Sequence, residues 1–168
     1  MVQMKITRHG EAGQTNGIPF EVKAVFPNVT LEAQGDGKVN ISNLRGKYTL
    51  VSVVPDINTR VCSLSTKKFN QEADQFAKIN FYTVSTNTVA EQEQWCAAEG
   101  VEKMQLLADH DGQLGRKLGI YVEESHTDAR SIWILDQKGR IVYRELIVEQ
   151  SNEPNYQKAL EFLKVHAK

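Results

Sequence analysis

The sequence predicts an α/β fold built around a central β-sheet, and three observations support this prediction. Residues 48–55 and 80–86 are nearly continuous runs of β-branched and apolar side chains, typical of strands buried on both faces. Each run is followed by a segment with helical periodicity, the order in which helices cover a mostly parallel sheet. The length of 168 residues is that of one domain, so we expect residues 1–168 to fold as a single unit.

The N-terminal part has a weaker pattern. Residues 1–15 alternate loosely between apolar and polar side chains and contain Gly10 and Gly13, which predicts a short N-terminal hairpin or arm. Residues 16–42 mix glycine, proline and asparagine with short β-prone pieces. These pieces are residues 20–25, 29–31 and 38–41.

The first central strand is predicted at residues 48–55, Y-T-L-V-S-V-V-P, and ends at Pro55. After a turn, residues 61–77 have the spacing of an amphipathic helix. The residues on one side of this helix are Cys62, Phe69, Ala73 and Phe76. Cys62 is therefore predicted near the beginning of the helix, close to the end of a buried strand.

The second strand, at residues 80–86, leads into a helix with recognisable ends. Thr88 and Glu91 form a T-x-x-E capping box, and Gly100 is well placed to end the helix. This helix carries the second cysteine, Cys96, directly after Trp95.

The C-terminal part completes the predicted sheet. A short strand is expected at residues 104–109 and a short helix at 113–118. Two strands at 130–136 and 140–146 read as an antiparallel hairpin, and residues 155–167 as a final amphipathic helix. This order is the thioredoxin-like arrangement, a central mixed sheet flanked by helices, with an N-terminal hairpin extension.

Charge and composition exclude several partners. The net charge is −1, with both signs scattered along the chain, which argues against nucleic acid or an anionic membrane as a partner. The first residues lack the apolar region of a secretory signal, and apolar runs are far shorter than the roughly 18 residues of a membrane-spanning helix. We therefore expect a cytoplasmic protein. Two cysteines there are expected as thiols, metal ligands or redox groups rather than a structural disulfide.

Cys62 occupies a position where catalytic groups are common, beyond the carboxyl end of a central strand. The first turn of a helix favours a thiolate, and a cation from Arg60 or Arg130 would lower the thiol pKa further. The alternative is that Cys62 is a small buried apolar residue. Cys96, taken alone, fits a packing residue.

The spacing of the two cysteines excludes a C-x-x-C pair. The four histidines are scattered without an i, i+4 pair, so we expect no zinc site. These histidines are His9, His110, His126 and His166.

Several motifs resemble the thiol peroxidases, the atypical two-cysteine branch of the peroxiredoxins. The family motif P-x-x-x-T-x-x-C stands here as Pro55, Thr59 and Cys62. The segments S-V-V-P, K-F-N-Q-E-A and W-C-A-A-E-G are also similar to the family. A-R-S-I-W-I-L-D is similar to the family strand that bears the active-site arginine, here Arg130. The resemblance extends from about residue 15 to the end of the chain.

The resemblance implies a role for each matched residue. Cys62 is implied as the peroxidatic cysteine, which attacks the peroxide, and Cys96 as the resolving cysteine, which forms a disulfide with it. The Thr59 hydroxyl would form hydrogen bonds with the peroxide and the thiolate. Arg130 would stabilise the thiolate and the negative charge that develops on the departing oxygen, and Pro55 would shield the site from water. The implied reductant is thioredoxin and the implied assembly a homodimer; no metal, haem or flavin is required.

Two positions depart from the family pattern. Asn58 stands where the family usually has aspartate, and Arg60 where it has a small residue or proline, which makes the local charge more positive. Two other functions stay open: a disulfide oxidoreductase on the same fold, and a non-enzymatic peroxide sensor or scaffold. For individual residues, Thr59 could simply cap a helix and Arg130 could form a surface ion pair.

Overall fold

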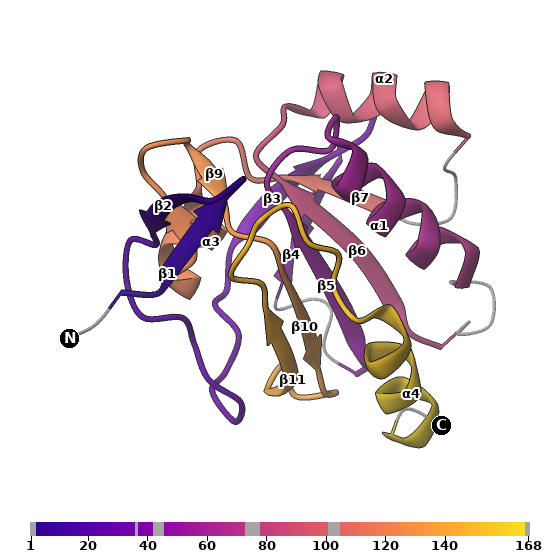
Figure 1. Cartoon of the computed structure of the whole chain (residues 1–168). Helices are drawn as coiled ribbons and strands as arrows, with labels where there is room; N and C mark the ends of the chain where they lie inside the picture. Colours follow the sequence, from indigo (N-terminus) through magenta and orange to yellow (C-terminus); the bar gives the residue numbers. More distant parts are fainter. Residues whose placement is uncertain (1–2, 36, 42–45, 73–77, 101–104, 167–168) are drawn as a thin grey trace.

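The computed structural model describes residues 3–35, 37–41, 46–72, 78–100 and 105–166, without the side chains of residues 60–63 and 65. Within this part, a seven-stranded mixed sheet has the strand order β11-β10-β5-β6-β7-β3-β4 (Figure 1). Its strands are β3 Thr30–Ala33, β4 Lys38–Asn40, β5 Thr49–Val54, β6 Asn80–Ser85, β7 Gln105–Ala108, β10 Ser131–Leu135 and β11 Ile141–Leu146. Strands β5, β6 and β7 are parallel, whereas β10 is antiparallel to β5.

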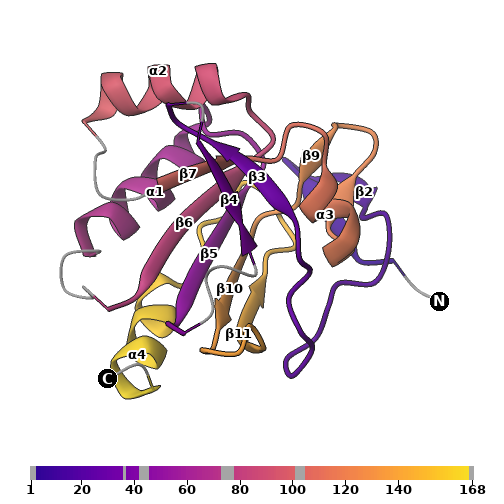
Figure 2. The same ribbon diagram turned by 180° about the vertical axis from the view of Figure 1, so that it is seen from behind.

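Helices and small hairpins cover the two faces of this sheet. One face packs against α1 Arg60–Glu72, α2 Val89–Glu99 and α4 Tyr156–His166. The other face carries α3 Gln113–Leu118 and two hairpins (Figure 2). These hairpins are β1 Lys5–Arg8 with β2 Glu11–Gln14, and β8 Tyr121–Val122 with β9 Thr127–Asp128. Among the described residues, no helix combines the length and apolar character required to cross a membrane.

The central strands are buried on both faces, as the sequence predicts. In β5, Leu50 and Val54 pack under α1, α2 and α4, while Val51 and Val53 pack on the opposite side. Every residue of β5 is buried. The lack of polar alternation in this run therefore reflects a strand covered by structure on both sides.

Helix α2 begins and ends where its sequence signals predict. Thr88 Oγ1 accepts the Glu91 N–H at 3.3 Å, and Glu91 Oε1 accepts the Thr88 N–H at 3.2 Å. At the other end Gly100 has a φ of 68° and its N–H donates to the Cys96 carbonyl at 2.9 Å. Cys96 therefore lies in the last turn of α2.

Several predictions about local structure differ from the fold. Residues 20–25 form no strand, because Lys23 adopts a positive φ of 85° that turns the chain; only Val25 bridges to Arg140. The sequence contains no signal for the β8–β9 hairpin, since two residues per strand carry no periodicity. Phe69 is buried as expected, whereas Ala73 and Phe76 lie outside the described residues.

Gly119 ends α3 at a close backbone approach, and its replacement by alanine is expected to destabilise the protein. Its φ is 79°, and an added Cβ would lie 2.3 Å from the Ile18 carbonyl oxygen, a main-chain atom that cannot rotate away. Backbone strain and overpacking together are expected to lower the free energy of unfolding by about 2–4 kcal/mol. Chemical denaturation measures this loss.

The matched control is Gly100→Ala. Gly100 has a similar φ of 68°, but no atom of the described residues lies within 4 Å of the Cβ that alanine would add, so we expect only the strain of about 1–2 kcal/mol. Equal losses in the two variants would contradict the role of the contact with Ile18.

Candidate active site

The ends of the central strands bring distant parts of the chain to one edge of the sheet. Val54, the last residue of β5, pairs with Ser85, the last residue of β6. Ser131, the first residue of β10, pairs with Val53. The loop that follows β5 and the arginine that precedes β10, Arg130, therefore lie at the same edge.

The loop between β5 and α1 is held by the loop that follows β6. Thr86 Oγ1 donates to the Pro55 carbonyl at 3.0 Å. The Asn87 side chain accepts the Ile57 N–H at 2.8 Å and donates to Asp56 Oδ1 at 3.0 Å. These bonds fix the path of the chain into the first turn of α1.

A pocket of about 390 Å³ lies at this edge. Its lining residues are Arg8, His9, Pro55, Asp56, Thr59, Ser125, Thr127, Arg130, Gln150 and Ser151. Three predicted site residues, Pro55, Thr59 and Arg130, thus line one cavity. Cys62 is the third residue of α1, directly beyond Thr59, but its side chain lies outside the described part of the structure.

The N-terminal end of α1 is directed at the same place. Thr59 precedes the first helical residue, and its Oγ1 donates to the Asp56 carbonyl at 2.9 Å. The first turn of α1 contains no acidic residue to offset the partial positive charge of the helix end. A thiolate at position 62 would lie in that field.

Arg130 is held in the interior, with only 3% of its surface exposed. This excludes the alternative that it forms a surface ion pair. Its main-chain N–H donates to Gln150 Oε1 at 2.6 Å, and its Nε–H donates to the Gln150 carbonyl at 2.9 Å. The sequence does not predict Gln150 as a site residue, because nothing in its local sequence distinguishes it.

The N-terminal hairpin forms another part of the pocket wall. Arg8 Nη2 donates to Thr127 Oγ1 at 3.2 Å, which joins β1 to β9. Glu149 accepts the Gly10 N–H at 2.9 Å and bonds from the Ser151 hydroxyl and N–H. The bonds from Ser151, followed by that from Gly10, lower the pKa of Glu149 to about 2.

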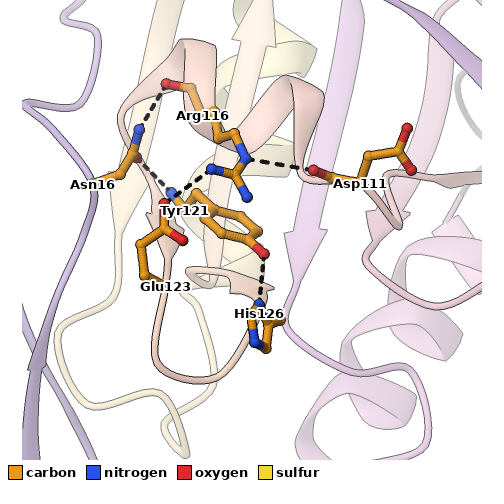
Figure 3. A network of polar contacts seen from close by, with 6 residues as sticks. All are labelled: Asn16, Asp111, Arg116, Tyr121, Glu123 and His126. Carbon is orange, nitrogen blue, oxygen red and sulfur yellow. Dashed lines mark hydrogen bonds and ion pairs between the residues drawn. The ribbon is translucent and has the colours of Figure 1, made fainter.

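A polar network supports the β8–β9 hairpin from the side of α3 (Figure 3). The Arg116 guanidinium stacks 4.1 Å from the centre of the Tyr121 ring and pairs with Glu123 at 2.9 Å. Tyr121 Oη and His126 Nδ1 are 3.3 Å apart. The Asn16 side-chain amide donates to the Arg116 carbonyl and accepts the Tyr121 main-chain N–H, both at 3.0 Å. The pocket residues Ser125 and Thr127 lie on either side of His126 in the sequence, so the bond between His126 and Tyr121 helps to fix the turn on which they lie.

Asp128 is a buried carboxylic acid next to this pocket, in β9. Neither of its oxygens accepts a hydrogen bond from an N–H donor among the described residues, and it lies against Gly115 and Asp109. The Asp109 carboxylate already accepts the N–H groups of Leu114 and Gly115, both at 3.0 Å. Burial first, and then the hydrogen bond and charge of Asp109, raise the pKa of Asp128 well above its usual range.

Asp128→Asn is therefore expected to stabilise the protein at neutral pH. A carboxyl whose pKa is raised by folding favours the native state when protonated, and this stability is lost as the pH rises above the unfolded value of about 3.9. Asparagine removes the titration and supplies a donor for Asp109. We expect the free energy of unfolding at pH 7 to rise by about 1–3 kcal/mol, with a smaller gain near pH 4.

Thermal and chemical denaturation from pH 4 to pH 8 measures both effects. Asp111→Asn, an exposed carboxyl in the neighbouring loop, is the control and should change stability by less than about 0.5 kcal/mol. An Asp128→Asn protein that is no more stable than the wild type at pH 7 would contradict the prediction.

Cys96 lies apart from the pocket, in the core between α2 and the sheet. It is a free thiol, 9% exposed, and is not among the residues that line the pocket. Burial raises its pKa, with a smaller opposing effect from a hydrogen bond with Gln34. In this conformation Cys96 is therefore a weaker nucleophile than an exposed thiol.

The chain is similar to several known proteins. The family model described as "AhpC/TSA family" matches residues 22–144. A thiol peroxidase of Bacillus subtilis is 37% identical over 165 residues, 98% of this chain and 99% of the relative. A thiol peroxidase of Listeria innocua is 40% identical over 139 residues, 82% of this chain and 84% of the relative.

Two solved structures share the fold. A peroxiredoxin-like protein from Aquifex aeolicus has a TM-score of 0.90 at 21% identity, over 96% of each chain. A thiol peroxidase from Chromobacterium violaceum has a TM-score of 0.88 at 11% identity, over 98% of each chain. The thioredoxin-like fold with an N-terminal hairpin is thereby confirmed.

Proposed function

The chain belongs to the thiol peroxidases of the AhpC/TSA family, and we propose that it reduces hydrogen peroxide and organic hydroperoxides through Cys62, with thioredoxin as the electron donor. The observation that carries the proposal is the pocket at the start of α1. Thr59, Pro55 and Arg130 line it, and Cys62 follows in the first helical turn.

In the proposed reaction the Cys62 thiolate attacks one oxygen of the peroxide. The O–O bond breaks, and the departing oxygen takes a proton and leaves as water or an alcohol. Cys62 becomes a sulfenic acid, the reversible first stage of cysteine oxidation. The helix end and the Arg130 cation support the thiolate. The Thr59 hydroxyl, which in this structure donates to the Asp56 carbonyl, would turn from that carbonyl and donate to the bound peroxide.

Cys96 is the proposed resolving residue. Its thiol condenses with the sulfenic acid, a disulfide forms and water leaves. Because Cys96 is buried in the last turn of α2, this step needs local unwinding of that turn, which ends at Gly100 and has few main-chain bonds to break. The dithiol of thioredoxin then reduces the disulfide. We place this cycle in the cytoplasm, as expected from the sequence, and we expect a homodimer on the family resemblance.

The test is peroxide consumption with thioredoxin, thioredoxin reductase and NADPH. A thiol peroxidase consumes many equivalents of peroxide per protein chain, with matching oxidation of NADPH. A sensor or scaffold consumes about one equivalent and stops, so that result would contradict the proposal. A disulfide oxidoreductase would instead reduce disulfide substrates without consuming peroxide.

A further inference from the structure

Gln150 makes two hydrogen bonds with Arg130. Its side-chain Oε1 accepts the Arg130 main-chain N–H at 2.6 Å, and its own carbonyl accepts the Arg130 Nε–H at 2.9 Å. One glutamine thus binds both the main chain and the guanidinium of the arginine. The Nε–H bond fixes the plane of the guanidinium, at the end of a long side chain that otherwise has many rotamers.

The NH₂ group of the Gln150 side chain bonds the main chain of residues 147–150, the segment to which Gln150 belongs. Nε2 donates to the Ile147 carbonyl at 2.7 Å and to the Val148 carbonyl at 3.4 Å. Gln150 is 3% exposed, so these bonds are shielded from water. The orientation of the amide follows from its partners, because Arg130 N–H must meet an acceptor and the two carbonyls must meet a donor.

The same segment is fastened to the N-terminal hairpin. The Gln150 N–H donates to the Thr7 carbonyl at 2.8 Å, and Thr7 N–H donates to the Val148 carbonyl at 2.9 Å. The position of the Gln150 carbonyl is therefore set by its own amide on one side and by β1 on the other.

We propose that Gln150 is a positioning residue for the peroxidase reaction, whose amide holds residues 147–150 in place so that the Gln150 carbonyl orients the Arg130 guanidinium at the pocket. The inference rests on the proposed function, since it acts only through Arg130. A donor fixed before the reaction stabilises developing charge without a cost of reorganisation.

The test compares Gln150→Met with the wild type. Methionine has a similar length but can neither accept the Arg130 N–H nor donate to the Ile147 and Val148 carbonyls. We expect kcat/KM for hydrogen peroxide to fall about tenfold, less than the 10²–10³-fold loss of a direct donor, and the Cys62 thiolate to titrate at a higher pH. Thiolate absorbance against pH gives the second readout, which a purely structural role would not change.

Two further variants keep the test decisive. Gln150→Glu has the same shape and still accepts the Arg130 N–H, so it remains informative if the methionine variant does not fold; it too should raise the pH of thiolate titration. Gln92→Met is the matched control, because Gln92 is fully buried and donates to Ser85 Oγ and the Leu107 carbonyl, both at 2.9 Å. It should lower thermal stability and leave thiolate titration unchanged.

The same substitution made in the Arg130→Ala protein distinguishes an error in the role of Gln150 from an error in the role of Arg130. There, Gln150→Met should cause no further loss beyond about twofold, because the two residues act as one unit. An equal tenfold loss in that background, or wild-type titration and kinetics in both Gln150 variants, would overturn the role of Gln150 alone. Wild-type behaviour of Arg130→Ala itself would overturn the proposed role of Arg130, and that of Gln150 with it.

Discussion

Cys62→Ser is expected to abolish thioredoxin-dependent peroxide reduction while leaving the fold intact. A serine hydroxyl is not ionised at neutral pH, whereas a thiol with an ordinary pKa of about 8.5 is easily shifted into the reactive range by a helix end and a cation. Loss of a covalent nucleophile costs on the order of 10³-fold or more in rate. The assay is NADPH-coupled peroxide consumption, with circular dichroism to verify the fold.

The informative control for this variant is Cys96→Ser. Its thiol is buried and not at the pocket, so the first reaction with peroxide should remain. The protein should then consume about one equivalent in a rapid phase and fail to cycle with thioredoxin. If the Cys62→Ser protein still cycled, the nucleophile would have to be another group, and the assignment of both cysteines would be wrong.

Arg130→Ala is expected to lower kcat/KM for peroxide by on the order of 10²–10³-fold, the usual loss for one preorganised donor at developing charge. Removal of this cation from the pocket should also raise the pH at which the Cys62 thiolate forms. Arg130→Lys should recover part of the rate, since it keeps the charge but not the Nε–H bond to the Gln150 carbonyl. Stopped-flow kinetics and thiolate absorbance measure the two effects.

Arg140→Ala serves as the control for the loss of positive charge. Arg140 is exposed at the opposite end of the β10–β11 hairpin, distant from the pocket. Its removal should leave kinetics and titration unchanged. Comparable losses in the two arginine variants would show that general charge, rather than the placement of Arg130, supports the reaction.

Local signals in the sequence are sufficient to predict most of the fold. The capping box of Thr88 and Glu91 and the cap at Gly100 depend on neighbours within one helical turn, and both are confirmed. The buried run that forms β5 is readable because burial on both faces removes polar residues almost entirely. The β8–β9 hairpin has no such signal, since its strands are held by contacts with α3 and residue 16.

The candidate site is predictable only where its residues are close in sequence or match a family motif. Pro55 and Thr59 belong to one motif, and the resemblance adds Arg130. Arg8 and Thr127, by contrast, form a hydrogen bond although they are 119 residues apart in the sequence, and Gln150 bonds Arg130 from 20 residues away. Such pairings depend on tertiary structure, so the sequence could not place the hairpin or Gln150 at the pocket.

The two departures from the family motif lie at the entry to α1. Asn58 is exposed, and its N–H donates to Asp56 Oδ1 at 3.0 Å, so this position helps to form the turn before the helix. The Arg60 side chain lies outside the described residues, and its effect on the thiolate stays a prediction. An unchanged thiolate titration in Arg60→Pro would remove that prediction.

The pairing of β5 with β10 determines where this protein can change in length. Val53 faces Ser131, one position from Arg130, so an inserted or deleted residue within either strand would turn the following side chains to the opposite face of the sheet. The turn between β10 and β11 is different: it lies at the far end of the sheet, where Asp136 Oδ1 accepts the N–H groups of Lys138 and Arg140. A peptide tag or a fluorescent domain inserted at residues 137–139 would extend away from the pocket, whereas a single added residue at the other end would separate the arginine from the motif.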